Sequence, residues 1–348
     1  MKAQVFRGVN QLSYEDIPVP TLLADEVLVQ VQVVGLCQSD IKKIRYPLYE
    51  PPRIFGHETA GTITSVGSEV IGWQVGQRVA VMHHIPCMRC AYCLNDNFSM
   101  CDTYKNICTT AGFAPSGGGF AEYVKVPGHI VRNGGLIPIP EHISFEEASF
   151  VEPTNCCLKA VKKAQIAPGQ TVLITGAGPI GLMFVMLVKS FGAKAIATDL
   201  LPSRIEKALS VGAEAAFDAR DTNLKAKINA ITDGVGVDVA LIAVPSEKAF
   251  FQALDNTRKG GKILFFAEFP DEMEIPINPN ILYRREIDLI GSYSSSYRLQ
   301  SLAVDVVFNR RIDVKALISD HYPLQDLSTA VERAIAPTAE TYKILIYP

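Results

Sequence analysis

Two rhythms of hydrophobic and polar positions follow one another along the chain of 348 residues. Up to about residue 123, short apolar runs alternate in part with polar residues, as in 26–34 and 76–81, and Gly and Pro separate these runs closely. Alternation with a period of two between turn residues is typical of β-strands. The pattern therefore predicts a β-rich first domain with functional loops.

From about residue 170 the pattern changes to strands that alternate with helices. Apolar runs of strand length occur at 171–175, 194–199, 237–242 and 262–266. Stretches with helical character lie between them, at 179–191, 203–211 and 246–258. Because strand–helix–strand units place their strands in parallel, we expect an α/β fold with a doubly wound parallel sheet of the Rossmann type.

These patterns predict the domain organisation. A β-rich domain covers 1–155, a Rossmann domain covers 156–291, and a C-terminal segment, 292–348, returns to the first domain. This segment contains a predicted helix at 299–308 and a closing strand at 342–346. We also expect strand 262–266 to lie at the edge of its sheet, where it can pair with a second subunit.

Composition and charge exclude several classes of partner. With 48% hydrophobic residues, 20% charged residues and a net charge of −3, the chain is typical of a soluble globular protein and has no basic surplus for nucleic acid. The uncharged stretch 164–188 has the length of a membrane span, but Gly and Pro break it into a strand, a turn and a helix. The start of the chain lacks a signal-peptide core and eight cysteines suit a reducing compartment, so we expect a cytoplasmic protein.

Four cysteines stand close together in a C-x-x-C-x-x-C-x7-C pattern: Cys87, Cys90, Cys93 and Cys101. This spacing lets four thiolates converge on one tetrahedral metal ion, which favours a structural zinc site without room for substrate. A bacterial iron–sulfur motif has three residues before its fourth cysteine and a proline after it, whereas here the gap is seven residues and Asp102 follows. Disulfides or free thiols are the other alternative.

A glycine-rich motif, Gly176-Ala177-Gly178-Pro179-Ile180-Gly181, follows one predicted strand and opens the next helix. Its glycines permit a tight turn and close approach to a pyrophosphate at the helix N-terminus, which predicts a dinucleotide site. Asp199 ends the following strand, where a carboxylate binds the ribose 2′-hydroxyl and repels a 2′-phosphate, so we expect NAD rather than NADP. Arg204 lies nearby and would tolerate such a phosphate. A packing turn and a capping role for Asp199 are the structural alternatives.

A second group of residues has the chemistry of a reactive metal site but a weaker pattern. Cys37 and His57 are potential ligands, with Glu58 beside His57 and Glu152 far along the chain. Three protein ligands and an open position would make a catalytic zinc that acts as a Lewis acid on a hydroxyl or carbonyl oxygen. A lone Cys in a β-rich segment is more often a small buried residue, and a lone His is more often structural, so the residues alone leave this site open.

The order of the motifs resembles that of the zinc-containing medium-chain dehydrogenases/reductases, the alcohol dehydrogenase family. It covers essentially the whole chain: GLCQSD at 35–40, FGHETAG at 55–61, the cysteine quartet, GGFAEY at 118–123, Glu152-Pro153 and the glycine motif. Some alcohol dehydrogenases use a second cysteine at the catalytic zinc where this chain has Glu152, so the pattern is most similar to sorbitol and other polyol-type dehydrogenases. The resemblance implies a GroES-like catalytic domain before the Rossmann domain.

The resemblance also implies roles for individual residues. Cys37 and His57 would bind the catalytic zinc, and either Glu58 or Glu152 would complete the site, directly or through water. Asp40 would orient the His57 ring through its second nitrogen, and Ser39 would bind the substrate hydroxyl and start a proton relay. A turn-capping carboxylate and a solvated serine are the alternatives for these two residues.

The chain departs from the family at Lys42, because many members carry there the histidine that ends the relay. Lys42, Lys43 and Arg45 form a basic turn that either is solvated or attracts an anionic group of the substrate.

These observations favour one function and leave two alternatives. The favoured function is the reversible oxidation of a secondary alcohol in a polyol, sugar alcohol or related polar substrate to a ketone, with hydride transfer to NAD and with one catalytic and one structural zinc per chain. We expect a homodimer or homotetramer. The alternatives are a zinc-free quinone or enoyl reductase that uses NADPH, and a non-catalytic protein that keeps the cofactor-binding scaffold.

Overall fold

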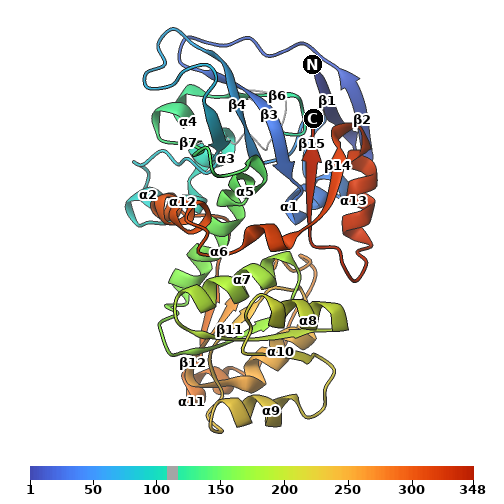
Figure 1. Cartoon of the computed structure of the whole chain (residues 1–348). Coiled ribbons are helices and arrows are strands. Elements are labelled where there is room, and N and C mark those ends of the chain that lie inside the picture. Colours follow the sequence, from blue (N-terminus) through green and yellow to red (C-terminus); the bar gives the residue numbers. More distant parts are fainter. Residues whose placement is uncertain (108–116) are drawn as a thin grey trace. The chain divides into compact units, whose positions relative to one another are not determined.

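The computed structural model describes residues 1–107 and 117–348, which divide into two compact units. The first unit consists of Met1–Asn155, Ser295–Arg310 and Ile318–Pro348, and the second of Cys156–Ser294 and Arg311–Leu317. The chain passes from one to the other within helix α6 (Val151–Lys163), and Figure 1 shows the elements of both. Each unit has its own hydrophobic core.

The first unit contains a mixed sheet of seven strands and a two-stranded sheet. The larger sheet has the order β14-β15-β3-β4-β5-β7, and β6 also pairs with β3. Its strands are β3 (Val27–Gly35), β4 (Glu58–Val66), β5 (Arg78–Val81), β6 (Tyr123–Val126), β7 (Leu136–Pro138), β14 (Ile318–Pro323) and β15 (Lys343–Tyr347), and the smaller sheet pairs β1 (Lys2–Gly8) with β2 (Gln11–Asp16). The exposed Gln30 stands between the buried Val29 and Val31, which shows the period of two along β3.

Short helices connect these strands and support the loops. They are α1 (Gln38–Arg45), α2 (Ala91–Leu94), α3 (Asp102–Ile107), α4 (Gly128–Arg132), α5 (Phe145–Ser149), α12 (Gln300–Phe308) and α13 (Leu327–Ile335). Single 3₁₀ turns lie at η1 (Phe98–Met100), η2 (Tyr297–Leu299) and η4 (Leu324–Asp326). Ser144 caps α5 with a reciprocal pair of hydrogen bonds to Glu147, which satisfies backbone donors at the start of that helix.

The end of the chain joins the sheet next to one of its first strands. β15 pairs antiparallel with β3 through Leu345 opposite Gly35 and Ile346 opposite Val34, and β14 pairs parallel with β15. The pairing places Lys343 beside the loop that follows β3, where its Nζ donates a hydrogen bond to the carbonyl oxygen of Leu36 at 3.1 Å.

The second unit is a parallel six-stranded sheet with helices packed on it. Its order is β10-β9-β8-β11-β12-β13, with β8 (Thr171–Thr175), β9 (Lys194–Asp199), β10 (Ala215–Asp218), β11 (Val237–Ile242), β12 (Thr257–Phe265) and β13 (Asp288–Gly291). The helices are α7 (Pro179–Ser190), α8 (Pro202–Ser210), α9 (Leu224–Ile231), α10 (Glu247–Asn256) and α11 (Pro279–Arg285), and the turn η3 (Val314–Leu317) also belongs to this unit. The strand order reverses at β8, between β9 and β11, where open parallel sheets bind ligands.

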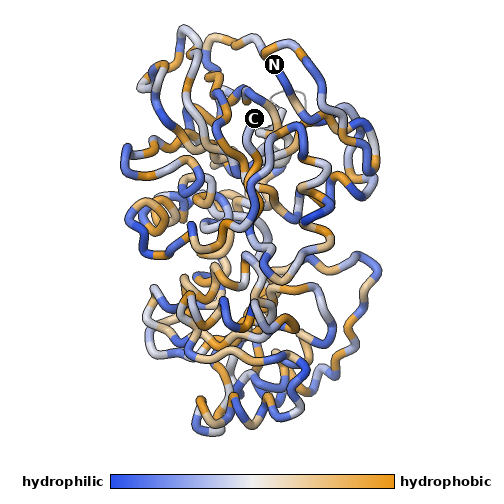
Figure 2. Tube along the Cα trace, turned by 45° about the vertical axis from the view of Figure 1, so that its right-hand side comes forward, coloured by the Kyte–Doolittle hydropathy of each residue, from blue (hydrophilic) through white to orange (hydrophobic). Residues whose placement is uncertain are grey.

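Burial explains the long uncharged stretch of the sequence. β8 is buried at every position, and α7 is buried from Gly181 to Val188. Figure 2 shows hydrophobic residues, in orange, recurring along the inner strands and helices. Among residues 1–107 and 117–348, no helix combines the length and apolar character that crossing a membrane would require.

The predicted fold class, a Rossmann-type parallel sheet together with a β-rich domain, is confirmed. The prediction that strand 262–266 forms a sheet edge is wrong, because β12 lies between β11 and β13, and β13 is the edge. β13 was not predicted, because it has only four residues and is mostly exposed, so the sequence shows no apolar run there. Within the C-terminal segment 292–348, residues 295–310 and 318–348 belong to the first unit, and residues 292–294 and 311–317 belong to the second.

Candidate functional site

The four cysteines of the quartet converge in one small region, the cysteine lobe (residues 87–101). Cys90 precedes α2, Cys93 lies within it, and the sulfur atoms of all four lie within 4.8 Å of one another. The Sγ–Sγ distance is 3.4 Å between Cys90 and Cys93 and 3.9 Å between Cys87 and Cys93. Tetrahedral zinc with sulfur ligands at about 2.3 Å separates these ligands by about 3.8 Å, so the four sulfurs fit such an ion.

The surroundings of the lobe favour thiolates that share a cation. Backbone N–H groups of Arg89 and Cys90 lower the pKa of Cys87 to about 6. Desolvation raises the pKa of Cys93 to about 12, so this sulfur becomes a thiolate only beside a positive charge. Four such ligands fill a tetrahedral ion and leave no position for substrate.

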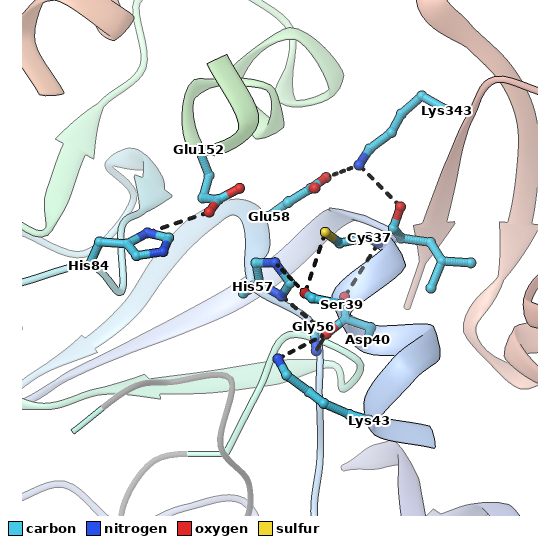
Figure 3. Close-up of polar contacts among 11 residues, drawn as sticks. Cys37, Ser39, Asp40, Lys43, Gly56, His57, Glu58, His84, Glu152 and Lys343 are labelled. Carbon is cyan, nitrogen blue, oxygen red and sulfur yellow. Dashed lines mark hydrogen bonds and ion pairs between the residues drawn. The ribbon is translucent and has the colours of Figure 1, made fainter. Parts of the chain in front are cut away.

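A second group of potential ligands, the open site, consists of Cys37, His57 and Glu58 (Figure 3). Cys37 lies between β3 and α1, where it is the N-cap residue of the helix, and Glu58 is the first residue of β4. The antiparallel register of the two strands pairs Gly35 with Glu58, which brings these segments together. One ligand atom from each of the three side chains lies within 4.8 Å of the others, and sulfur, nitrogen and carboxylate oxygen are all zinc ligands.

Asp40 is completely buried behind His57. Its Oδ1 lies 3.1 Å from His57 Nδ1 and 3.4 Å from the backbone nitrogen of Gly56, which donates to it. Burial acts against ionisation, but His57 and Lys43 outweigh it and lower the pKa of Asp40 to about 2. An ionised Asp40 accepts the proton of Nδ1 and leaves Nε2 of the imidazole as the nitrogen that can bind a metal.

The electrostatic surroundings of His57 favour a positive charge. Burial alone would lower the pKa of His57, but Asp40 and Cys37 raise it well above its ordinary value. A metal ion on Nε2 supplies that positive charge while the imidazole stays neutral, so the environment fits a cation.

Ser39 and Lys43 lie beside this group. Ser39 Oγ is 3.4 Å from Cys37 Sγ and 3.4 Å from His57 Nε2. Lys43 Nζ is 3.6 Å from Asp40 Oδ1, whereas Arg45 is exposed to solvent. Lys43 therefore neutralises Asp40.

Glu58 has a partner that the sequence analysis did not name. Lys343 on β15 is buried and forms an ion pair with Glu58. Burial would lower the pKa of Lys343, but Glu58, Cys37 and Glu152 raise it, so the ammonium stays charged. Gly35 makes room for the pair, because a Cβ at this position would lie 2.0 Å from Glu58 Oε2.

The structure groups Glu152 with two histidines, which we call the histidine pair (His83 and His84). His84 Nδ1 lies 3.4 Å from Glu152 Oε1, and ligand atoms of all three residues lie within 4.8 Å of one another. The two histidine rings are 3.7 Å apart, and the His83 ring is 5.1 Å from that of His57. Burial lowers the pKa of His83 well below its ordinary value, so this ring is neutral.

The charges around the open site balance when a dication is added. As a metal-binding thiolate, Cys37 adds one negative charge to those of Glu58 and Glu152, all three raise the pKa of Lys343, and Lys343 carries one positive charge. The remaining charge of −2 is balanced by one Zn²⁺ ion. Because a buried net charge of this size is strongly unfavourable, the donor set fits a divalent metal.

In the second unit the glycine motif forms the turn between β8 and α7. Gly176 has φ +93°, and a Cβ there would lie 2.3 Å from Val244 Cγ1. A Cβ on Gly181 would lie 1.8 Å from the carbonyl oxygen of Gly176, so a larger residue cannot occupy this turn. Gly178 is the N-cap of α7 and Pro179 is its first residue, ahead of Ile180. The turn thus lies at the N-terminus of α7, the positive end of a helix dipole, which attracts a phosphate.

Asp199, at the end of β9, stabilises this turn through hydrogen bonds to the backbone. Its Oδ2 accepts a hydrogen bond from the N–H of Ala177 at 2.8 Å, and its Oδ1 accepts one from Leu201 at 3.0 Å. Arg204 Nη1 lies 3.9 Å from the same carboxylate. The carboxylate and the guanidinium therefore stand together beside the glycine turn.

Sequence reasoning missed the histidine pair and Lys343. The sequence carried a signal for the pair, since two consecutive histidines stand between a predicted strand and Cys87. Lys343 left no local signal, because its place depends on the pairing of β15 with β3.

Comparison with known families matches both units. The family model for the alcohol dehydrogenase GroES-like domain matches residues 23–141, and the model for zinc-binding dehydrogenases matches residues 179–309. The first match includes all three residues of the open site and the whole cysteine lobe, whereas Glu152 and Lys343 lie outside it.

Similar proteins extend over nearly the full chain. A sorbitol dehydrogenase from Bacillus subtilis is 35% identical, over 100% of this chain and 97% of its own length. A D-arabitol-phosphate dehydrogenase from Enterococcus avium is 30% identical, over 94% of this chain and 92% of its own. Among solved structures, a putative zinc-binding dehydrogenase from Sinorhizobium meliloti bound to NADP has a TM-score of 0.89 and 27% identity, and the match covers 100% of this chain and 99% of that one.

Proposed function

The chain belongs to the zinc-binding dehydrogenases with an alcohol dehydrogenase GroES-like domain, and from this premise we propose how its residues act on a polyol. The protein is an oxidoreductase that uses zinc and a nicotinamide cofactor to oxidise a small polar alcohol of the polyol class. The observation that carries the residue assignment is the convergence of Cys37, His57 and Glu58, with Asp40 behind the imidazole.

In this proposal the open site holds the catalytic zinc. Cys37, His57 and Glu58 are its ligands, and Glu152 faces the same region from α6. When bound, the metal lowers the pKa of a substrate hydroxyl and so favours loss of its proton. Asp40 fixes the tautomer and orientation of His57, and Lys343 fixes Glu58.

Ser39 takes the proton of the substrate hydroxyl in this proposal. Its Oγ lies 3.4 Å from two of the proposed ligand atoms, so a hydroxyl bound beside them is within hydrogen-bond reach. Because a serine hydroxyl donates and accepts at once, it passes a proton outward as it receives one.

The cofactor proposal concerns the glycine turn of the second unit. Gly176, Gly178, Pro179, Ile180 and Gly181 would cradle the pyrophosphate, and the bound nicotinamide would accept the hydride. Asp199 supports NAD over NADP, because its carboxylate, although held by two backbone N–H groups, keeps lone pairs for a ribose hydroxyl and would repel a 2′-phosphate. Arg204, whose guanidinium stands beside Asp199, favours the opposite choice, so the two cofactors must be compared directly.

We extend the proposal to the roles of the segments and to assembly. Residues 1–155 with the C-terminal segment would form the catalytic domain, and residues 156–291 the cofactor domain. The exposed edge strand β13 supports a homodimer or homotetramer, and the thiols of the cysteine lobe support a reducing, cytoplasmic compartment. The lobe would bind the second, structural zinc.

One experiment tests the function and the metal assignment together. NADH or NADPH absorbance is followed with five- and six-carbon polyols, their phosphate esters and simple secondary alcohols, and metal content is measured on the same sample. We expect about two zincs per chain and turnover of polyols with NAD. One zinc per chain without turnover would support a scaffold that keeps only the structural site, and a metal-free chain that reduces quinones or enones with NADPH would support the reductase.

A further inference from the structure

Two carboxylates point toward the same buried region from different elements. Glu58 comes from β4 and Glu152 from α6, and both act on the charge of Lys343. Only Glu58 forms a group with Cys37 and His57 in which every ligand atom lies within 4.8 Å of the others. Glu152 forms its group with the histidine pair instead.

Each carboxylate has its own partner. Glu58 pairs with the ammonium of Lys343, and Glu152 Oε1 lies 3.4 Å from Nδ1 of His84, as Figure 3 shows. His84 and Glu152 are both buried, with exposed fractions of 8% and 5%. Neither side chain can therefore turn to solvent for another partner.

The His84 ring is fixed by packing on two sides. It lies 3.7 Å from the ring of His83 at an angle of 41°, and 5.2 Å from the ring of Tyr104 at 32°. Close contact between aromatic rings restricts how far either ring can rotate. A ring held in this way keeps its Nδ1 3.4 Å from the Oε1 atom of Glu152.

From these contacts we infer that His84 is a positioning residue, which keeps Glu152 off the metal so that Glu58 completes the open site with Cys37 and His57. The inference rests on the proposed function, because it concerns the metal that this function requires. It goes further by naming the residue that holds Glu152 away from the metal.

Charge and coordination explain why such a residue is needed. One thiolate and one carboxylate already neutralise a divalent ion. A second carboxylate on the ion would leave the centre with a net negative charge and would fill the position that a substrate oxygen needs. Held by His84, Glu152 instead stays within the field of Lys343, which balances it.

The test uses Co²⁺ in place of zinc, because the visible spectrum of Co²⁺ reports the number and kind of its ligands. The spectrum of the Cys37→Ser chain is subtracted to remove the contribution of the cysteine lobe. His84→Phe keeps a ring for packing but cannot contact the carboxylate through nitrogen, and His84→Gln keeps an N–H donor. We expect His84→Phe to shift the open-site spectrum toward a higher coordination number and to change the rate of metal loss to a chelator about tenfold.

The controls isolate Glu152. His84→Gln and Glu152→Gln should both keep the wild-type spectrum, and the double variant His84→Phe/Glu152→Gln should resemble Glu152→Gln, because the released carboxylate is then missing. Circular dichroism checks the fold of each variant. If His84→Phe does not fold, His84→Asn replaces it, since its shorter amide does not reach Glu152.

Four results would overturn the inference. They are an unchanged spectrum in His84→Phe, a shift that persists in the double variant, loss of the open-site metal in Glu152→Gln, and a third cobalt per chain that His84→Phe removes. The last would make Glu152 and the histidine pair a metal site of their own. These results leave the proposed function standing, whereas a wild-type spectrum that does not depend on Cys37 overturns the function and the inference together.

Discussion

The cysteine lobe draws all four of its potential ligands from residues 87–101, whereas the open site takes its three from the β3–α1 junction and the start of β4, with Glu152 of α6 and Lys343 of β15 beside them. In the lobe every donor is a sulfur. The open site mixes sulfur, nitrogen and oxygen and carries an ammonium as well.

This difference separates two uses of the same metal. Four thiolates from one short segment close the coordination of an ion and stabilise that segment. A mixed set of donors, each supported by a second residue, leaves a position open and fixes the direction of every ligand. The comparison predicts that damage to the lobe acts on folding and that damage to the open site acts on chemistry.

The largest effect should follow Cys90→Ala. Metal binding to isolated zinc-finger peptides contributes about 10–16 kcal/mol, so a lobe of this size should not stay folded with three thiolates. We expect one metal fewer per chain and loss of amide hydrogen-exchange protection confined to residues 87–101. Two results would contradict the separate roles of the two sites. One is a lobe that keeps its hydrogen-exchange protection without its metal, and the other is a change in the cobalt spectrum of the open site.

Cys37→Ser should act in the opposite way. It removes a ligand of the open site, and loss of Lewis-acid assistance worth several kcal/mol should lower kcat by about 10³-fold or more. NADH binding, followed by fluorescence, and the hydrogen-exchange protection of the lobe should not change. Undiminished turnover would refute the assignment of the catalytic metal.

Lys343→Met should destabilise the first unit. Removing one partner of a buried ion pair leaves an unbalanced charge and costs about 3 kcal/mol or more. We expect a lower midpoint of thermal unfolding, with part of the loss restored by Lys343→Arg.

Arg7→Met is the matched control for that variant. Arg7 pairs with Glu15, and both residues are accessible to solvent, so the midpoint should hardly change. Equal shifts of the unfolding midpoint in the two variants would mean that the buried pair of Lys343 and Glu58 contributes no more to stability than an exposed pair.

The smallest effect concerns Lys42 and Arg45 of α1, the helix that follows Cys37. With Lys42→Ala and Arg45→Ala combined, we expect the KM for a phosphorylated polyol to rise roughly tenfold, because hydrogen bonds to charged groups are worth about 1.5–3 kcal/mol. The KM for the neutral polyol should stay constant. Equal kinetics of the wild type and the double variant on both substrates would show that these two basic residues are solvated and do not bind the substrate.

Much of the fold followed from periodicity, because the signals were local. Four of the six strands in the second unit, β8, β9, β11 and β12, were predicted from their apolar runs, and β8 is buried at all of its positions. β10, β13 and most of the short helices of the first unit were not predicted, because elements of so few residues show no clear hydrophobic period. The position of β12 inside the sheet depends on β13 and could not be recognised without it.

The sites were predictable to the degree that their ligands are neighbours in sequence. The cysteine quartet was visible from spacing alone, and the glycine motif from its context between a strand and a helix. Cys37 and His57 became credible only through the resemblance to a family. Which glutamate stands with them could not be decided, because α6 and β15 reach the site through tertiary packing, and Lys343 is invisible until β15 pairs with β3.

Lys343 also follows every other residue of the open site along the chain. A ribosome makes the protein from its N-terminus, so the two glutamates and the thiol of Cys37 exist long before the ammonium that balances them. The cysteine lobe is complete once residue 101 has emerged and can take up its ion during synthesis. Because Lys343 reaches Glu58 only after β15 has joined β3, we expect the proposed metal of the open site to bind late in the synthesis of the chain.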